Sequence, residues 1–267
     1  MSEFCRINFI PQITMAVDDR KKNFEYNIKK FKMLDLSSPT LQGKRVAIVG
    51  GSPSLINHLE ELKEYDVIWA INGTYKYLKE KGIKSVFVTV DAYFQDVSDV
   101  EEAIVINTAC RELIDSFKTE NVRLVSLEPQ FGEPFLNGGT TTATRLPHLA
   151  FLLGCFDIGI FGCDGSYTNT THVNGSPKLN VTSETMLIVK IENEEFLTNV
   201  QMLHQTENLV MFVKEFPEFI KNHSEGLLKA MVKDDNWTTV AFSELLYKDL
   251  LAGNCIDEQP IYKEIVI

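Results

Sequence analysis

Residues 43–54 have the sequence GKRVAIVGGSPS, and this stretch decides the fold class. A charged lead is followed by the continuous apolar run Val46 to Val49 and then by Gly50 and Gly51. A continuous apolar run of this length is typical of a strand buried on both faces, and the glycines allow the chain to turn sharply after it. The stretch therefore predicts a buried parallel strand that leads into a helix, which we expect over residues 55–63.

The same alternation continues along the chain. Strands are expected at residues 66–71, 85–90, 103–107 and 122–127, and in the run FDIGIFGCD at 156–164. Further helices are expected at residues 75–81, 111–117 and 141–153. Strands that alternate with helices of this length form parallel sheets covered on both faces. The sequence therefore predicts an α/β fold with a Rossmann-like, doubly wound, mostly parallel sheet.

The flanking segments lack the regular alternation of predicted strands and helices. We expect an N-terminal extension over residues 1–40, a Rossmann-like domain over 41–235 and a C-terminal tail over 236–267. The polar stretch SYTNTTHVNGSPKLNVTSET, residues 166–185, predicts a long functional loop. Residues 194–232 are expected to be helical, with a break near Pro217.

Composition narrows the class of partner. The formal net charge of -11 disfavours a binder of nucleic acid polymers, because such proteins need a basic surface to displace counterions. Any bound nucleotide is therefore expected to be a small molecule. The 5 cysteines are scattered, which is typical of reduced thiols in a cytoplasmic protein. We expect no secretion signal and no transmembrane segment, since no apolar run is long enough to cross a bilayer.

The first candidate site follows the first core strand. Gly50 and Gly51 would let the backbone approach a ligand, while Ser52 and Ser54 offer hydroxyl groups. A helix that begins here would present N–H groups to a phosphate. The turn has no P-loop lysine and is not a GxGxxG motif, so an ordinary tight turn is the alternative.

Two more polar turns follow the next strands. Asn72 and Gly73 could bind a ribose or base through the asparagine amide, or could form an Asx turn. Asp91 could orient a ribose or a metal ion, or could cap the next helix. Parallel strands end at one edge of the sheet, so these turns are expected to lie on the same rim as the first.

A glycine-rich turn precedes the helix expected at residues 141–153. Gly138, Gly139 and Thr140 would direct the N-terminus of that helix toward the rim. A simply capped helix is the alternative.

The last candidate group combines an acid, a tyrosine and a histidine. Asp164 ends a predicted buried strand and could hold a metal ion or polarise an acceptor, while Tyr167 and His172 follow within nine positions. His172 could act as a base near neutral pH. Taken singly, each could be a capping acid or a surface side chain. Together, on one solvated rim, they suggest the catalytic residues of an active site.

Several segments resemble the MptE-like family, which includes archaeal 6-hydroxymethylpterin diphosphokinases and the central domain of Maf flagellin glycosyltransferases. They are VAIVGGSPSL, AINGTYKYLKEKGIKSVFVTVDA, NGGTTTATRLPHLAFLLG, IGIFGCDGSYTNTTHVNG and, more weakly, NHSEG at residues 222–226. The resemblance extends from Gly43 to about Val232. The same turns are more remotely similar to those of bacterial lipooligosaccharide sialyltransferases.

The resemblance implies roles for the rim residues. Gly51, Ser52, Asn72, Gly139, Thr140 and Asp164 would contact a nucleotide, and Tyr167 and His172 would lie near the transferred group. Gly165 and Ser166 depart from the pattern expected between the aspartate and the tyrosine. The chain also lacks the large flanking regions of the flagellin-modifying members, so the resemblance does not predict a protein acceptor.

Three functions stay open. The first is transfer of a sialic- or nonulosonic-acid-type sugar from a CMP donor to a small-molecule or glycan acceptor, with no required cofactor. The second is a diphosphokinase that moves pyrophosphate from ATP to a pterin alcohol, with Mg²⁺ on Asp91 and Asp164. The third is a nucleotide-binding module without catalysis, which is the safer interpretation if Asp164, Tyr167 and His172 do not share a pocket with Gly51 and Asn72.

Overall fold

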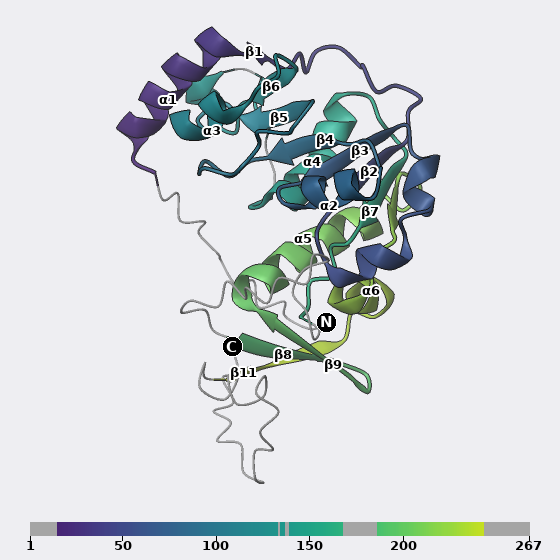
Figure 1. Ribbon diagram of the computed structural model, residues 1–267. Coiled ribbons are helices and arrows are strands. Elements are labelled where there is room, and N and C mark those ends of the chain that lie inside the picture. The colour runs from purple at the N-terminus through teal and green to yellow at the C-terminus, as the bar shows by residue number, and fades with distance from the viewer. Residues whose placement is uncertain (1–14, 133, 137–138, 168–185, 243–267) are drawn as a thin grey trace.

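The computed structural model describes residues 15–132, 134–136, 139–167 and 186–242 (Figure 1). Its main layer is an 8-stranded sheet with the order β1-β6-β5-β4-β3-β2-β7-β10, in which every neighbouring pair is parallel. The strands are β1 (Lys32–Met33), β2 (Val46–Val49), β3 (Val67–Ile71), β4 (Val86–Thr89), β5 (Ala103–Ile106), β6 (Val122–Val125), β7 (Ile158–Phe161) and β10 (Ile220–Asn222). The predicted α/β fold with a mostly parallel, doubly wound sheet is confirmed.

The sheet is buried on both faces because its strands alternate between two cores. Ala47 and Val49 of β2 point into one core, which they share with Leu78 and Leu113. Val46 and Ile48 point into the other core. All four β2 side chains have no exposed surface. The apolar run that predicts a doubly covered strand therefore packs as such.

Helices cover each face. The first core receives side chains from α2 (Thr74–Glu80) and α3 (Arg111–Ser116), and α1 (Val17–Lys30) packs against α3. The second core receives side chains from α4 (Thr142–Leu152) and α5 (Val200–Glu215). These helices include those predicted at residues 75–81, 111–117 and 141–153.

The helix predicted at residues 55–63 is wrong. Two 3-10 turns replace it, η1 (Pro53–Asn57) and η2 (Glu61–Glu64). In the first turn the His58 N–H bonds to the Leu55 carbonyl, three residues back. Leu55 and Leu62 are both buried, while Glu61 reaches a histidine of a distant segment. These tertiary contacts override the local helical preference.

The prediction for residues 194–232 is partly wrong. An antiparallel sheet with the order β11-β8-β9 includes residues that the sequence assigned to a helix. Its strands are β8 (Met186–Ile191), β9 (Glu194–Asn199) and β11 (Trp237–Phe242). The expected break is present, since α5 ends at Glu215 and β10 and α6 (Gly226–Lys233) follow. Figure 1 shows this small sheet beyond one end of the main sheet, with α5 running between them.

The division into an extension, a domain and a tail stays a prediction. From the predicted extension, β1 pairs with β6 of the main sheet. From the predicted tail, β11 pairs with β8 of the small sheet.

Candidate functional site

The order of the main sheet places a switch point between β2 and β7. The chain moves outward from β2 through β3, β4, β5 and β6, and then returns to add β7 and β10 on the other side. In open α/β sheets ligands bind outside the carboxyl ends of the strands at such a point. Here Gly50 and Gly162 face each other, and a Cβ added to Gly50 would lie 2.4 Å from the Gly162 carbonyl oxygen. The backbones of Gly50 and Gly162 are therefore in close contact at the switch point.

Asp164 joins the segments that meet at the switch point through hydrogen bonds inside the protein. Its Oδ1 accepts hydrogen bonds from the Ser54 hydroxyl at 2.5 Å and from the Glu225 N–H at 3.1 Å. Its backbone N–H donates to the Ser52 hydroxyl oxygen at 3.1 Å. The residue is only 3% exposed, so the expected place on a solvated rim is wrong for Asp164. The structure does bring Ser52, Ser54 and Asp164 together.

The Asp164 carboxyl also changes the electrostatics of the first candidate turn. Burial raises the pKa of Asp164, and hydrogen bonds from Ser54 and Glu225 oppose that shift. In the turn that was expected to present N–H groups to a phosphate, the Ser54 N–H faces Asp164 Oδ2 at 3.4 Å. A phosphate at Ser54 would therefore have to approach a carboxyl group. The Ser52 N–H is also engaged, with the Gly162 carbonyl at 2.9 Å.

A histidine cluster beside Asp164 was missed as a functional feature. The Glu61 carboxylate oxygens lie 3.0 Å from His58 Nδ1 and 2.9 Å from His223 Nδ1. The His223 ring stacks on Phe161 with centroids 4.3 Å apart, and its Nε2 lies 3.2 Å from the Tyr65 hydroxyl. The NHSEG segment, which includes His223, was the signal for this cluster. The cluster fastens that segment over the end of β7.

Asn72 and Asp91 form a second polar group on the carboxyl rim. Asn72 has a left-handed backbone with φ of 50°, and its Nδ2 donates to Asp91 Oδ2 at 2.7 Å. Gln95 donates to the Thr89 hydroxyl oxygen at 3.2 Å and lies 3.5 Å from Asn72 Oδ1. Neighbouring protein atoms raise the pKa of Asp91 by limiting its hydration, while the Asn72 hydrogen bond lowers it. Asp91 is nevertheless exposed and accessible to a ligand.

A cavity of about 450 Å³ lies beside this group. Asn72, Gly73 and Lys76 line it from the end of β3 and from α2, and Gln95 and Asp96 line it from the loop after β4. These side chains supply two amides, one amine and one carboxylate. Such a lining suits a ligand rich in hydroxyl groups.

The N-terminus of α4 adjoins the end of β4. The Val90 N–H donates to the Thr142 hydroxyl oxygen at 3.2 Å, which joins the two segments. Thr141 caps the helix, and the N–H of Thr140 donates to the Thr144 hydroxyl oxygen at 3.0 Å. Gly139 has φ of 64°. Gly138 lies outside the described residues.

Tyr167 lies with the small sheet rather than with Asn72. Its hydroxyl oxygen accepts a hydrogen bond from Asn199 Nδ2 at 2.7 Å, and its N–H donates to the Leu197 carbonyl at 2.7 Å. His172 lies outside the described residues. Among the described residues, these side chains thus have three different sets of hydrogen-bond partners: Asp164 bonds to the serine turn, Asn72 to Asp91, and Tyr167 to Asn199.

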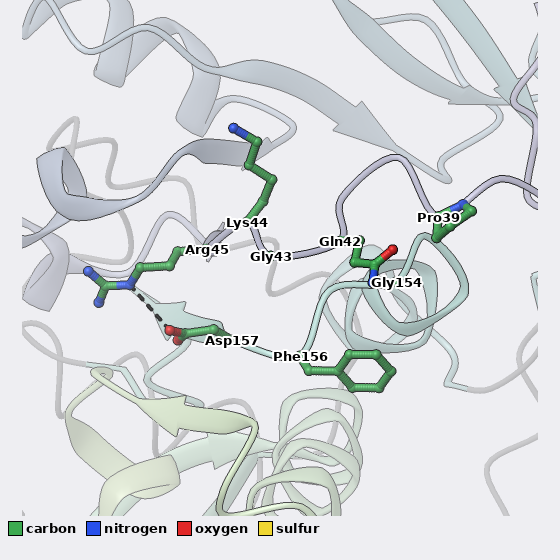
Figure 2. A pocket seen from close by; sticks show the side chains of 8 residues that line it. All are labelled: Pro39, Gln42, Gly43, Lys44, Arg45, Gly154, Phe156 and Asp157. Carbon is green, nitrogen blue, oxygen red and sulfur yellow. Dashed lines mark ion pairs between the residues drawn. The ribbon is translucent and has the colours of Figure 1, made fainter.

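A further cavity, of about 710 Å³, lies at the opposite edge of the sheet, where β2 and β7 begin (Figure 2). Arg45 turns away from Phe156 toward Asp157, with 3.4 Å between Arg45 Nε and Asp157 Oδ2. Its guanidinium carbon also lies 4.6 Å from the Tyr65 ring centroid. Of the described residues that line this cavity, none belongs to the predicted site.

A family model matches residues 19–170, more than half of the chain. Its description is 6-hydroxymethylpterin diphosphokinase MptE-like. The chain belongs to the MptE-like family. The predicted membership is confirmed, although the match begins within α1, well before Gly43, and ends before the small sheet. No curated protein matches the chain by sequence.

Two solved structures are similar to this chain, and the first of them shares the fold. The structure of the MAf glycosyltransferase from Magnetospirillum magneticum AMB-1 aligns with a TM-score of 0.58 and 17% identity over 89% of this chain and 42% of its own. This chain therefore spans less than half of that protein. A mammalian sialyltransferase in complex with Gal-beta-1-3GalNAc-ortho-nitrophenol aligns with a TM-score of 0.45 and 11% identity over 79% of this chain and 80% of its own. Among the described residues, no helix is long and apolar enough to span a bilayer.

Proposed function

We propose that the protein is a nucleotide-dependent transferase, and that its nucleotide binds at the rim formed by Asn72, Asp91 and the start of α4. Asn72 and Asp91 present an amide and a carboxyl group that suit the hydroxyls of a ribose. The N-terminal end of α4, next to β4, carries the partial positive charge that favours a phosphate. The Gly50-to-Ser54 turn supports this rim from the neighbouring strand, with its serines bound to Asp164.

In the favoured version, the transferred group is a sialic- or nonulosonic-acid-type sugar and the donor is its CMP conjugate. The bond between the anomeric carbon of the sugar and the phosphate oxygen breaks, CMP leaves with the electron pair, and an acceptor hydroxyl loses its proton as it bonds to that carbon. Tyr167 and His172 are the proposed groups for hydrogen bonding and proton transfer at this step. A small-molecule or glycan acceptor and a cytoplasmic location belong to the same proposal.

The observation that carries this choice is the engaged Asp164 carboxyl group. The diphosphokinase version, which the family description favours, would hold Mg²⁺ on Asp91 and Asp164. Asp164 is buried, and its oxygens already accept hydrogen bonds from Ser54 and Glu225. Mg²⁺ needs accessible carboxylate oxygens, so this pair does not fit as its ligands. Sugar transfer from CMP needs no such ion.

A binding module without catalysis is the second candidate, and one observation favours it. Among the described residues, Asp164 and Tyr167 form hydrogen bonds to different parts of the fold. A module of this kind would bind nucleotide and release it unchanged. Incubation with a CMP-sugar and analysis of the products separates the two functions, because only a transferase, or its slow hydrolytic side reaction, releases CMP.

The binding proposal is tested by thermal-shift titration with CMP, CDP, ATP, UDP and GDP, with and without magnesium. A ligand that binds only the folded state raises the melting temperature, by an amount that grows with its concentration relative to Kd. We expect stabilisation by CMP that is independent of magnesium. Magnesium-dependent stabilisation by ATP would favour the diphosphokinase, and no shift with any nucleotide would refute the proposed site.

Asn72→Gly is the matched variant for this titration. Glycine adopts the positive φ of residue 72 without strain, so the fold is retained while the amide is removed. We expect the Kd for CMP to rise roughly fivefold to tenfold, as for the loss of one or two hydrogen bonds. An unchanged Kd would mean that the nucleotide does not bind at this rim.

A further inference from the structure

Two adjacent aromatic side chains project from the loop that follows β4. Tyr93 is 52% exposed and Phe94 is 60% exposed. Single exposed apolar residues are common on protein surfaces, but two exposed aromatic residues that are consecutive in sequence suggest a binding role. Neither ring is required by the two cores of the main sheet, since neither belongs to them.

The loop that carries the pair is fixed at its base. On one side Asn72 donates to Asp91 at 2.7 Å, and on the other Gln95 donates to the Thr89 hydroxyl oxygen at 3.2 Å. In the middle the Cys110 N–H donates to the Ala92 carbonyl at 2.7 Å. The rings are therefore presented by a backbone that is anchored before and after them. Anchoring of this kind lowers the entropy lost when a ligand binds.

The position of the loop indicates what the rings would meet. Asp91, two residues before Tyr93, is bonded to Asn72, and Gln95, directly after Phe94, lines the cavity of about 450 Å³. Val90, directly before Asp91, is bonded to the first residue of α4. Groups suited to a ribose and to a phosphate thus lie at the base of the loop that carries the two rings.

We propose that Tyr93 and Phe94 form a stacking platform for the nucleobase of the bound nucleotide. This inference rests on the proposed nucleotide site. A base is attached directly to its ribose, so a ribose at Asn72 and Asp91 would bring the base close to the loop that begins at Asp91. Stacking on an aromatic ring gives affinity for any base, while hydrogen bonds elsewhere select among bases.

The test compares a ligand that has a base with one that lacks it. Tyr93→Ala/Phe94→Ala is titrated by calorimetry with CMP and with ribose 5-phosphate. We expect the Kd for CMP to rise about tenfold or more, as for other base–aromatic contacts. The Kd for ribose 5-phosphate should stay within twofold of the wild-type value. Because both side chains are exposed, the melting temperature of the free protein should not change.

Phe156→Ala is the matched control. Phe156 is 55% exposed, comparable to Tyr93 and Phe94, but it lies at the opposite edge of the sheet. This variant should bind both ligands as the wild type does. In addition, Phe94→Trp should retain CMP binding, and its added indole should be quenched by CMP and not by ribose 5-phosphate.

The outcomes separate the inference from the function on which it rests. If the wild type binds CMP and the double alanine variant binds it equally well, the platform is refuted while the nucleotide site stands. An equal rise in the Kd values for CMP and ribose 5-phosphate would also refute the platform. The rings would then stabilise the conformation of the loop and would not stack on a base. If the wild type binds no nucleotide, the proposed site itself fails.

Discussion

At Asp164, burial decides what a carboxyl group does. The side chain receives hydrogen bonds from Ser54 and Glu225 and joins segments that are far apart in sequence. We therefore predict that Asp164→Asn lowers the free energy of unfolding by about 2 kcal/mol, because one carboxyl acceptor becomes an amide donor that faces buried donors. Urea denaturation followed by tryptophan fluorescence measures this change.

Glu80→Gln provides the comparison for Asp164. Glu80 is an exposed carboxylate on α2, so its substitution should alter the free energy of unfolding by less than about 0.5 kcal/mol. If Asp164→Asn were equally mild, the carboxyl group would be accessible after all and would return to the candidate catalytic groups.

At the scale of single elements, the buried strands were predictable and the small sheet was not. The strands of the main sheet, such as β2 and β7, are continuous apolar runs because both faces are covered. The β8–β9 hairpin turns through Glu192 and Asn193, with φ of 52° at Glu192. Asn193 is a usual turn residue, but the left-handed position belongs to Glu192, where glycine, asparagine or aspartate is the usual signal, and the turn was therefore missed.

The same residue yields a prediction about the hairpin. Glu192→Gly should raise the free energy of unfolding by about 0.5 kcal/mol, because glycine removes the steric cost of the left-handed conformation. Glu194→Gly, in the adjoining strand β9, should lower it by a similar amount, since glycine weakens a strand. Thermal unfolding of the two variants measures both. Equal losses in the two would contradict the left-handed turn.

At the scale of the whole molecule, contacts between distant segments determine how the site is arranged. The sequence places Ser54 and Asp164 after strand ends, and the order of parallel strands explains why those ends meet on one rim. The NHSEG segment was predicted to be helical, and it begins at the last residue of β10, a strand that was not predicted. The sequence does not predict the direction in which each side chain points. Asp164 turns inward to Ser54, 110 residues away, and Tyr167 turns toward the small sheet. The rim was therefore predictable, whereas the hydrogen-bond partners of its side chains were not.

The His223 cluster links this arrangement to the pH dependence of global stability. Burial lowers the pKa of His223 below its usual value near 6.5, and Glu61 opposes that shift. Lys221, His58, Glu61 and Tyr65 are the charged or titratable groups around it. As pH falls below about 6.5, the unfolded chain binds a proton that the folded protein resists, so this histidine reduces stability until pH passes its folded pKa.

Other groups act in the opposite direction over part of this range. Burial raises the pKa values of Asp164 and Glu207, so the folded protein binds protons more readily at these groups and gains stability from them as pH falls. The contribution of His223 is therefore measured as a difference between wild type and His223→Gln. Urea midpoints between pH 7.5 and 5.5 should fall less steeply, or rise more steeply, in the variant. Parallel plots of urea midpoint against pH would mean that His223 has the same pKa in the folded and unfolded states. In that case a neutral His223 imidazole stacked on Phe161 would not hold the NHSEG segment in place.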